Sequence, residues 1–177
     1  MKRLLVISDN HFQQKEFINI VNHYDDIDYY IHCGDSQWNP DNALLQHFTV
    51  VRGNNDFNSL PHDVLLEIEN KKVLVTHGHT QYVYNYGDAD NTSGTADLVT
   101  YALQEYGANV VLYGHTHVPE MHIDRDVFVL NPGSTNFPRG FQHRVQCYAI
   151  VTIDNDTVSA NFYNAKTHED ITREITG

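Results

Sequence analysis

Basic side chains are scarce in this sequence of 177 residues, which carries 11 lysine and arginine residues against 23 acidic ones and a formal net charge of −12. Such a surface repels long polyanions, which argues against a nucleic-acid groove lined with lysine and arginine. The acidity itself favours solubility. A site for a phosphate anion would need positive charge from another source, and bound metal ions are the obvious supplier.

Cysteine and long apolar runs are scarce as well. Cys33 and Cys147 form neither a CxxC motif nor a disulfide framework. No segment approaches the roughly 20 apolar residues of a membrane span. The first apolar run, Leu4–Ile7, stops at Ser8-Asp9, before the roughly 7–15 apolar residues that a signal peptide needs. We therefore expect a cytoplasmic, reduced protein with no membrane partner.

What the sequence does contain is a series of apolar runs of strand length. Several are continuous rather than alternating, which is typical of strands buried on both faces. The runs are Leu4–Ile7, Tyr29–Ile31, Phe48–Val51, Val73–Val75, Val110–Tyr113, Val127–Leu130 and Tyr148–Ile153. In addition, Val64–Ile68 and Lys71–Thr76 flank Glu69-Asn70, which predicts a tight hairpin.

Three stretches between these runs have helical periodicity. Lys15–His23 is the first, and Asn42–His47 the second, with Asp41 as its N-cap. The third is Ala96–Tyr106, with Leu103 on its inner face and Gly107 where a helix commonly ends. The polar stretch Tyr82–Gly94 predicts a surface loop. Together these elements predict one mixed-sheet α/β domain over residues 1–177.

Polar clusters follow five of the strand-like runs, at the point where each run ends. In open α/β sheets, ligands bind outside the carboxyl ends of the strands. We therefore expect seven side chains to converge there: Asp9, His11, Asp35, Asn54, His77, His115 and His117. Flanking glycines allow close backbone approach, and the Asp-x-His and His-x-His spacings predict side chains on one side of an extended backbone.

Aspartate, imidazole and amide oxygen suit a hard-to-borderline divalent cation. Seven ligands exceed what one tetrahedral ion needs, so two ions that share one carboxylate are the economical arrangement. Two dications, the carboxylates of Asp9 and Asp35 and a bridging hydroxide would leave a single positive charge, which attracts phosphate. Metal binding also lowers the pKa of bound water toward about 7.

Five ordered motifs in the sequence resemble the calcineurin-like metallophosphoesterases. They are Asp9-x-His11, Gly34-Asp35, Gly53-Asn54-Asn55-Asp56, His77-Gly78-His79 and Gly114-His115-Thr116-His117. The chain length and the later Asn131-Pro132-Gly133-Ser134 resemble the small bacterial and archaeal phosphodiesterases of that superfamily. The match spans residues 9 to about 140, and the five motifs together are specific where any one alone is weak.

The resemblance implies an α/β fold in which a two-sheet sandwich of mixed β-sheets is flanked by helices. It implies one metal ion held by Asp9, His11, Asp35 and His117. A second ion would be held by Asp35, Asn54, His77 and His115, with Asp35 bridging. The implied reaction is in-line attack of metal-bound hydroxide on a small phosphoester. Manganese is the expected metal, with iron, zinc, nickel or cobalt as alternatives. The sequence leaves open whether the chain forms a homo-oligomer.

The sequence departs from the family at one position. Many members have histidine directly after the motif asparagine, where this chain has Asn55. An amide donates a hydrogen bond but is no general acid. With Asp35, Asn54 and Asn55 as catalytic residues, we therefore expect a phosphodiesterase that favours acidic leaving groups.

Four further side chains have predicted roles near the site. Arg52 and Arg139, with Asn55, are predicted substrate contacts, although each arginine fits a surface ion pair equally well. His79 is predicted to orient a ligand or to line the pocket. Asp56 is predicted to hold the asparagine loop by accepting backbone hydrogen bonds. The other histidines are expected to be structural or on the surface.

Two alternatives remain. The same fold serves in the retromer coat as a protein-binding scaffold with a degraded metal site, and other enzymes of this fold act on monoesters or nucleotides. All seven ligand positions are intact here, which disfavours the scaffold. Asn55 counts against a monoesterase.

Overall fold

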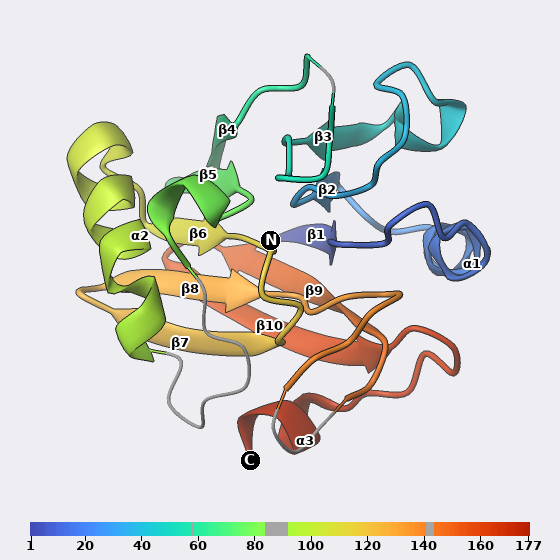
Figure 1. The fold of residues 1–177 in the computed structure, drawn as a ribbon. Helices are drawn as coiled ribbons and strands as arrows, with labels where there is room; N and C mark the ends of the chain where they lie inside the picture. Colours follow the sequence, from blue (N-terminus) through green and yellow to red (C-terminus); the bar gives the residue numbers. More distant parts are fainter. Residues whose placement is uncertain (58, 84–91, 141–143) are drawn as a thin grey trace.

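Two five-stranded mixed sheets pack face to face in the computed structural model, and helices cover their outer faces (Figure 1). The structure describes residues 1–57, 59–83, 92–140 and 144–177. The strands are β1 (Lys2–Ile7), β2 (Tyr29–His32), β3 (Phe48–Val50), β4 (Asp63–Ile68), β5 (Lys71–Thr76), β6 (Val110–Leu112), β7 (Glu120–Asp124), β8 (Val127–Asn131), β9 (Cys147–Asp154) and β10 (Thr157–Asn164). One sheet has the order β10-β9-β1-β2-β3 and the other β4-β5-β6-β8-β7.

Short helical segments connect the strands. They are α1 (Lys15–His23), η1 (Ala43–Leu45), η2 (His79–Gln81), η3 (Thr92–Thr95), α2 (Ala96–Tyr101), η4 (Ala102–Tyr106) and α3 (Thr172–Thr176). None of the described helices is long and apolar enough to cross a membrane.

Alternate residues of the central strands face different parts of the core. Leu4 of β1 packs between the two sheets, whereas Leu5 packs with Phe17 of α1 on the outer face of the first sheet. On the second sheet, Leu74 of β5 packs outward against Leu98 of α2. Both faces of each central strand are therefore buried, which explains the continuous apolar runs. The predicted two-sheet sandwich flanked by helices is confirmed.

Two predicted helices differ in detail. The segment Asn42–His47 contains only the short η1, and its N-cap is Asn42 rather than Asp41, because the Asn42 side chain accepts the Leu44 N–H at 2.9 Å. The helix over Ala96–Tyr106 has the predicted length and ends at Gly107, whose φ is +59°. Its second half, η4, is a π-helix with more residues per turn. Leu103 therefore leaves the inner face and is 37% exposed.

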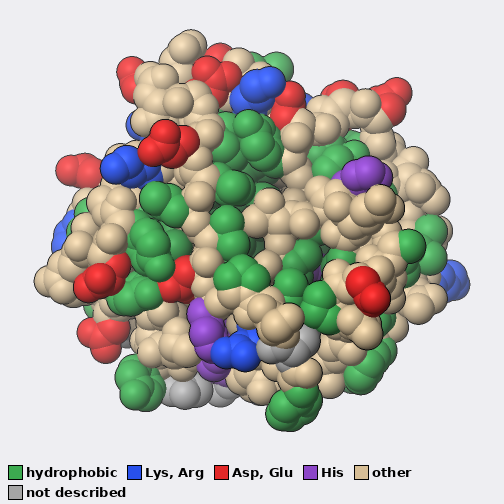
Figure 2. Space-filling view, turned by 90° about the horizontal axis from the view of Figure 1, so that it is seen from above, with side chains coloured by type: hydrophobic (Ala, Val, Ile, Leu, Met, Phe, Trp, Pro, Cys, Tyr) green, Lys and Arg blue, Asp and Glu red, His purple; other side chains and the backbone are tan. Residues whose placement is uncertain are grey.

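The parallel strands place the predicted ligand loops along one edge. β1, β2 and β3 run parallel in one sheet, as do β5, β6 and β8 in the other. The predicted hairpin is confirmed by antiparallel pairing of β4 with β5. Most of the predicted loop Tyr82–Gly94 lies outside the described residues. On the face seen in Figure 2, basic side chains are scattered and form no continuous stripe.

Candidate metal centre

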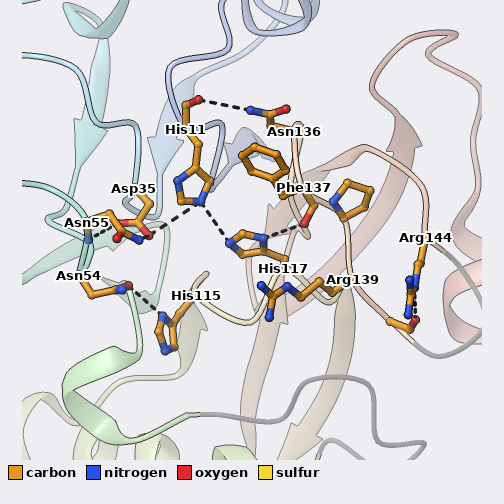
Figure 3. Close-up of a pocket in the computed structure, with 12 residues that line it drawn as sticks. His11, Asp35, Asn54, Asn55, His115, His117, Asn136, Phe137, Arg139 and Arg144 are labelled. Atoms are coloured by element: carbon orange, nitrogen blue, oxygen red, sulfur yellow. Dashed lines mark hydrogen bonds and ion pairs between the residues drawn. The ribbon is translucent and has the colours of Figure 1, made fainter.

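All seven predicted ligands lie together beyond the carboxyl ends of five strands, and Figure 3 shows five of them around one cavity. Asp9 and His11 follow β1, Asp35 follows β2, Asn54 follows β3, His77 follows β5, and His115 and His117 follow β6.

The first group of donors surrounds the Asp9 carboxylate. Its Oδ1 lies 3.2 Å from Nε2 of His117 and 3.8 Å from Nε2 of His11, and these two nitrogens are 3.2 Å apart. Asp9 Oδ1 is buried and accepts no hydrogen bond of regular geometry within the described part of the chain. A buried carboxylate oxygen facing imidazole nitrogens fits a bound cation.

The second group shares a carboxylate with the first. Asp35 Oδ2 lies 3.4 Å from Nε2 of His77 and 3.9 Å from Nε2 of His11. Asn54 Oδ1 lies 3.0 Å from both His77 Nε2 and His115 Nδ1. Asp35 therefore stands between the two sets of imidazoles, where a bridging ligand belongs. Asp9, His11 and His117, and likewise Asp9, Asp35 and His77, are close enough to hold an ion.

Three imidazoles are held so that Nε2 faces the carboxylates. In each, Nδ1 contacts an oxygen acceptor at 2.7 Å: Gln37 Oε1 for His11, the Cys33 carbonyl for His77 and the Phe137 carbonyl for His117. A proton on Nδ1 leaves the Nε2 lone pair for a metal. The sequence did not predict these partners. Two of them are backbone carbonyls, for which side-chain identity gives no signal.

The backbone at the ligands is not extended, so that expectation from the Asp-x-His and His-x-His spacings is wrong. Five ligands lie after the strands in left-handed conformations: Asp9 (φ 54°), His11 (φ 40°), Asp35 (φ 57°), His115 (φ 70°) and His117 (φ 61°). Aspartate and histidine tolerate this region better than branched residues do. Such strain, concentrated in one cluster, is typical of functional sites.

The predicted role of Asp56 is confirmed. Its Oδ2 accepts the backbone N–H groups of Asp35 and Gly53, and its Oδ1 accepts that of Gln37, each at 2.8 Å. One buried carboxylate thus joins the β2 loop to the β3 loop. A separate link ties the Asn131-Pro132-Gly133-Ser134 turn to the β1 loop, because the Ser134 hydroxyl donates to the Asp9 carbonyl at 2.7 Å.

Asn55 makes contacts that the sequence did not predict. Its backbone N–H donates to Asp35 Oδ1 and its side-chain amide to Asp35 Oδ2, both at 2.8 Å. Asn55 therefore fixes the carboxylate that stands between the two groups of imidazoles. Its side chain is also exposed on the wall of the cavity, so the predicted contact with substrate stays a prediction.

The acidic pair raises the proton affinity of two imidazoles. Burial alone would lower the pKa of His77, but the carboxylates of Asp9 and Asp35 raise it to about 9. The pKa of His117 is raised by Asp9 against the same effect of burial. Burial also works to raise the pKa of Asp35, yet the hydrogen bonds and charge of His77 hold it well below its usual range. The negative charge of the Asp9 and Asp35 carboxylates is therefore balanced by positive charge, either from protons on the imidazoles or from bound metal ions.

Metal binding should therefore release protons. At pH 7.5 His77 is protonated in the metal-free protein, because its pKa is about 9, and it must lose that proton to coordinate. We expect release of about one proton or more on Mn²⁺ binding, declining as pH rises through 9. Calorimetric titrations in buffers of different ionisation enthalpy measure it. Equal heats in all buffers at pH 7.5 would contradict this assignment.

The cavity beside the cluster has a volume of about 1000 Å³. Arg139 lines it and extends toward His117 in Figure 3, where its charge also acts to lower the pKa of His117. Arg52 is not among its lining residues, and its guanidinium contacts the His62 ring. His79 stacks edge-on against His77, with ring centroids 5.3 Å apart. Its predicted orienting role stays a prediction.

Known proteins with similar sequences and structures support the same interpretation as the geometry of the site. Residues 1–156 match the calcineurin-like phosphoesterase superfamily domain. The probable metallophosphoesterase YsnB of Bacillus subtilis is 34% identical over 168 residues, which cover 94% of this chain and 93% of that protein. A crystal structure of a predicted phosphoesterase from Streptococcus pneumoniae matches with a TM-score of 0.82 at 33% identity, covering 96% of this chain and 92% of that one.

One more distant structure shares the fold. Vps29 of Entamoeba histolytica, solved in complex with zinc, matches with a TM-score of 0.70 at 22% identity over 95% of both chains. At that identity the likeness concerns the fold alone.

Proposed function

The chain belongs to the calcineurin-like phosphoesterase superfamily, and we propose that it is a phosphodiesterase that uses two divalent metal ions. Membership supports a metal-dependent phosphoesterase, and the chain carries groups of side chains that could hold such ions. The observation that carries the dinuclear proposal is the Asp35 carboxylate, within 3.9 Å of both His11 and His77.

The ligands divide into two sets around that carboxylate. Asp9, His11 and His117 would hold one ion with Asp35, and Asn54, His77 and His115 would hold the other. Two divalent ions there lower the pKa of water and polarise a phosphoryl oxygen. Manganese is the metal we propose, on the mixed oxygen and imidazole donor set.

Two side chains on the cavity wall would act on the substrate or on the carboxylate between the ions. Arg139 supplies a guanidinium that matches a phosphoryl oxygen pair. Asn55 keeps Asp35 in place and has a second amide hydrogen for a phosphoryl oxygen. Neither Arg139 nor Asn55 is a general acid, so the alcohol has to depart as an anion. Diesters with acidic alcohols therefore suit the site better than unactivated monoesters.

A direct test compares bis(p-nitrophenyl) phosphate with p-nitrophenyl phosphate in Mn²⁺. We expect faster hydrolysis of the diester and loss of both activities in chelator. A monoester rate above the diester rate would reject the phosphodiesterase proposal. Absence of hydrolysis, with no metal found by elemental analysis, would favour a non-catalytic protein-binding scaffold of the same fold.

Replacing Asn55 by histidine tests the missing general acid. We expect Asn55→His to raise turnover of an unactivated alkyl monoester more than that of the aryl diester, because only the poor leaving group gains from protonation. The gain should be about 100-fold, the lower end of the usual range for general acid catalysis. The ratio of the two kcat/KM values is the measurement. An equal or opposite change would discard the role assigned to position 55.

We propose a cytoplasmic location on the basis of the two cysteine thiols. Cys33 and Cys147 are both buried and free, as expected in a reducing compartment. A small phosphoester is the proposed partner.

A further inference from the structure

A second cavity of about 570 Å³ adjoins the metal centre. Asn55 lines both cavities. Gln37, which lines the second one, holds the His11 ring of the first through its Oε1 at 2.7 Å. The two cavities therefore share Asn55 as a common wall, so a ligand at the metal centre lies next to the second cavity.

Two exposed aromatic rings line the second cavity. Phe12 is 60% exposed and Phe57 is 96% exposed, and they come from the loops after β1 and β3. Single exposed apolar residues are ordinary. Two phenylalanine rings from distant parts of the sequence beside one cavity form a local apolar surface, and a flat ring would remove it from water.

Backbone contacts fix the loop position of Phe12. Phe12 has φ 66°, and its N–H donates to the Ser36 carbonyl at 3.0 Å. A left-handed backbone is unusual for a bulky residue and is tolerated only where neighbours enforce it. Trp38 also lines the cavity; it is 6% exposed and packs edge-on against Phe17, with ring centroids 4.9 Å apart. The cavity thus has a fixed aromatic floor.

Charge selects against an anion in this cavity. Asp41 is among its lining residues, and no lysine or arginine is found among those described there. The amides of Gln37, Asn39 and Asn55 offer hydrogen bonds to ring heteroatoms. Phosphate belongs in the first cavity with Arg139, and an uncharged ring belongs in the second.

We propose that this second cavity binds an aromatic or heterocyclic ring on an ester group of the phosphodiester. Phe12 and Phe57 are then specificity-determining residues. The proposal rests on the phosphodiesterase function, because the ring is placed by a phosphate held at the metal centre.

Binding is measured separately from hydrolysis. Trp38 is the sole tryptophan in the sequence, so its indole N–H gives one signal in a nitrogen–proton correlation spectrum. The zinc-loaded protein is titrated with diphenyl phosphate and with dimethyl phosphate. We expect diphenyl phosphate to shift the Trp38 signal and to bind about 10-fold more tightly. Equal affinities without a shift would overturn the proposal.

Variants identify the residues responsible. Phe12→Ala combined with Phe57→Ala should reduce the preference for diphenyl over dimethyl phosphate about 10-fold, as two ring contacts are removed. Ile123→Ala is the matched control, because Ile123 on β7 is 71% exposed and lines neither cavity. An unchanged preference in the double variant, or an equal loss in the control, would overturn the proposal.

Hydrolysis of bis(p-nitrophenyl) phosphate with Mn²⁺, assayed in parallel, separates this proposal from the function on which it rests. Normal hydrolysis of that diester, with equal binding of diphenyl and dimethyl phosphate, rejects the second cavity as a ring site and leaves the phosphodiesterase intact. Absence of both hydrolysis and phosphate binding rejects the phosphodiesterase and the ring site with it.

Discussion

Replacing Asp35 by asparagine is expected to lower Mn²⁺ affinity more than about 100-fold and to abolish phosphodiester hydrolysis. Loss of a residue that merely orients a metal ligand costs about 10–100-fold. Asp35 lies within reach of both His11 and His77, so both proposed ions lose a ligand together. Isothermal titration with Mn²⁺ gives the affinity, and hydrolysis of bis(p-nitrophenyl) phosphate gives the rate.

The fold of the Asp35→Asn variant should survive. Asparagine has the same shape, and the Asp35 backbone N–H stays bound to Asp56 at 2.8 Å. Repulsion between the carboxylates of Asp9 and Asp35 also disappears, which offsets part of the loss of the ion pair with His77 and of the hydrogen bond to Asn55. We expect the melting temperature of the metal-free variant within about 5 °C of the parent. Retained high-affinity binding of two ions would show that Asp35 does not bridge.

Replacing Gly53 by alanine is expected to destabilise the protein by about 3 kcal/mol and to weaken metal binding, because a side chain at this position meets the Asp35 carboxylate. A Cβ there would lie 2.6 Å from both Asp35 Cγ and the Asp35 backbone nitrogen. The backbone nitrogen is held by Asp56 and cannot move aside cheaply. This places the substitution at the upper end of the usual cost of overpacking, about 1–3 kcal/mol.

Gly107→Ala is the control for this substitution. Gly107 has φ 59°, and apart from its chain neighbours no atom of the described residues lies within 4 Å of the place that an alanine methyl would occupy. Only backbone strain of about 1–2 kcal/mol therefore applies, and the Mn²⁺ affinity should equal that of the parent. Urea unfolding and Mn²⁺ titration of both variants provide the comparison. A Gly53→Ala protein with parental metal affinity would mean that the loops do not need this close approach.

The convergence of the seven candidate ligands could be predicted because it depends on side-chain type and on strand order. Each ligand follows an apolar run, and parallel strands bring such positions to one edge. Asp56 was also predictable, since an aspartate in a glycine-rich turn commonly accepts backbone N–H groups. Both features depend on which residue type occupies a given position, and the sequence gives that information directly.

The supports of the ligands were not predictable. His77 and His117 are oriented by the carbonyls of Cys33 and Phe137, and any residue has a carbonyl. Gln37 contacts His11 across 26 positions of sequence, a pairing that only the fold defines. The left-handed backbone at Asp9 and His117 is likewise set by tertiary contacts rather than by local spacing.

Anomalous X-ray diffraction from crystals soaked in Mn²⁺ tests the central claim most directly. Two peaks are expected, one among Asp9, His11 and His117 and the other among Asn54, His77 and His115, with the Asp35 carboxylate bound to both. A single peak, or peaks away from Asp35, would contradict the dinuclear centre.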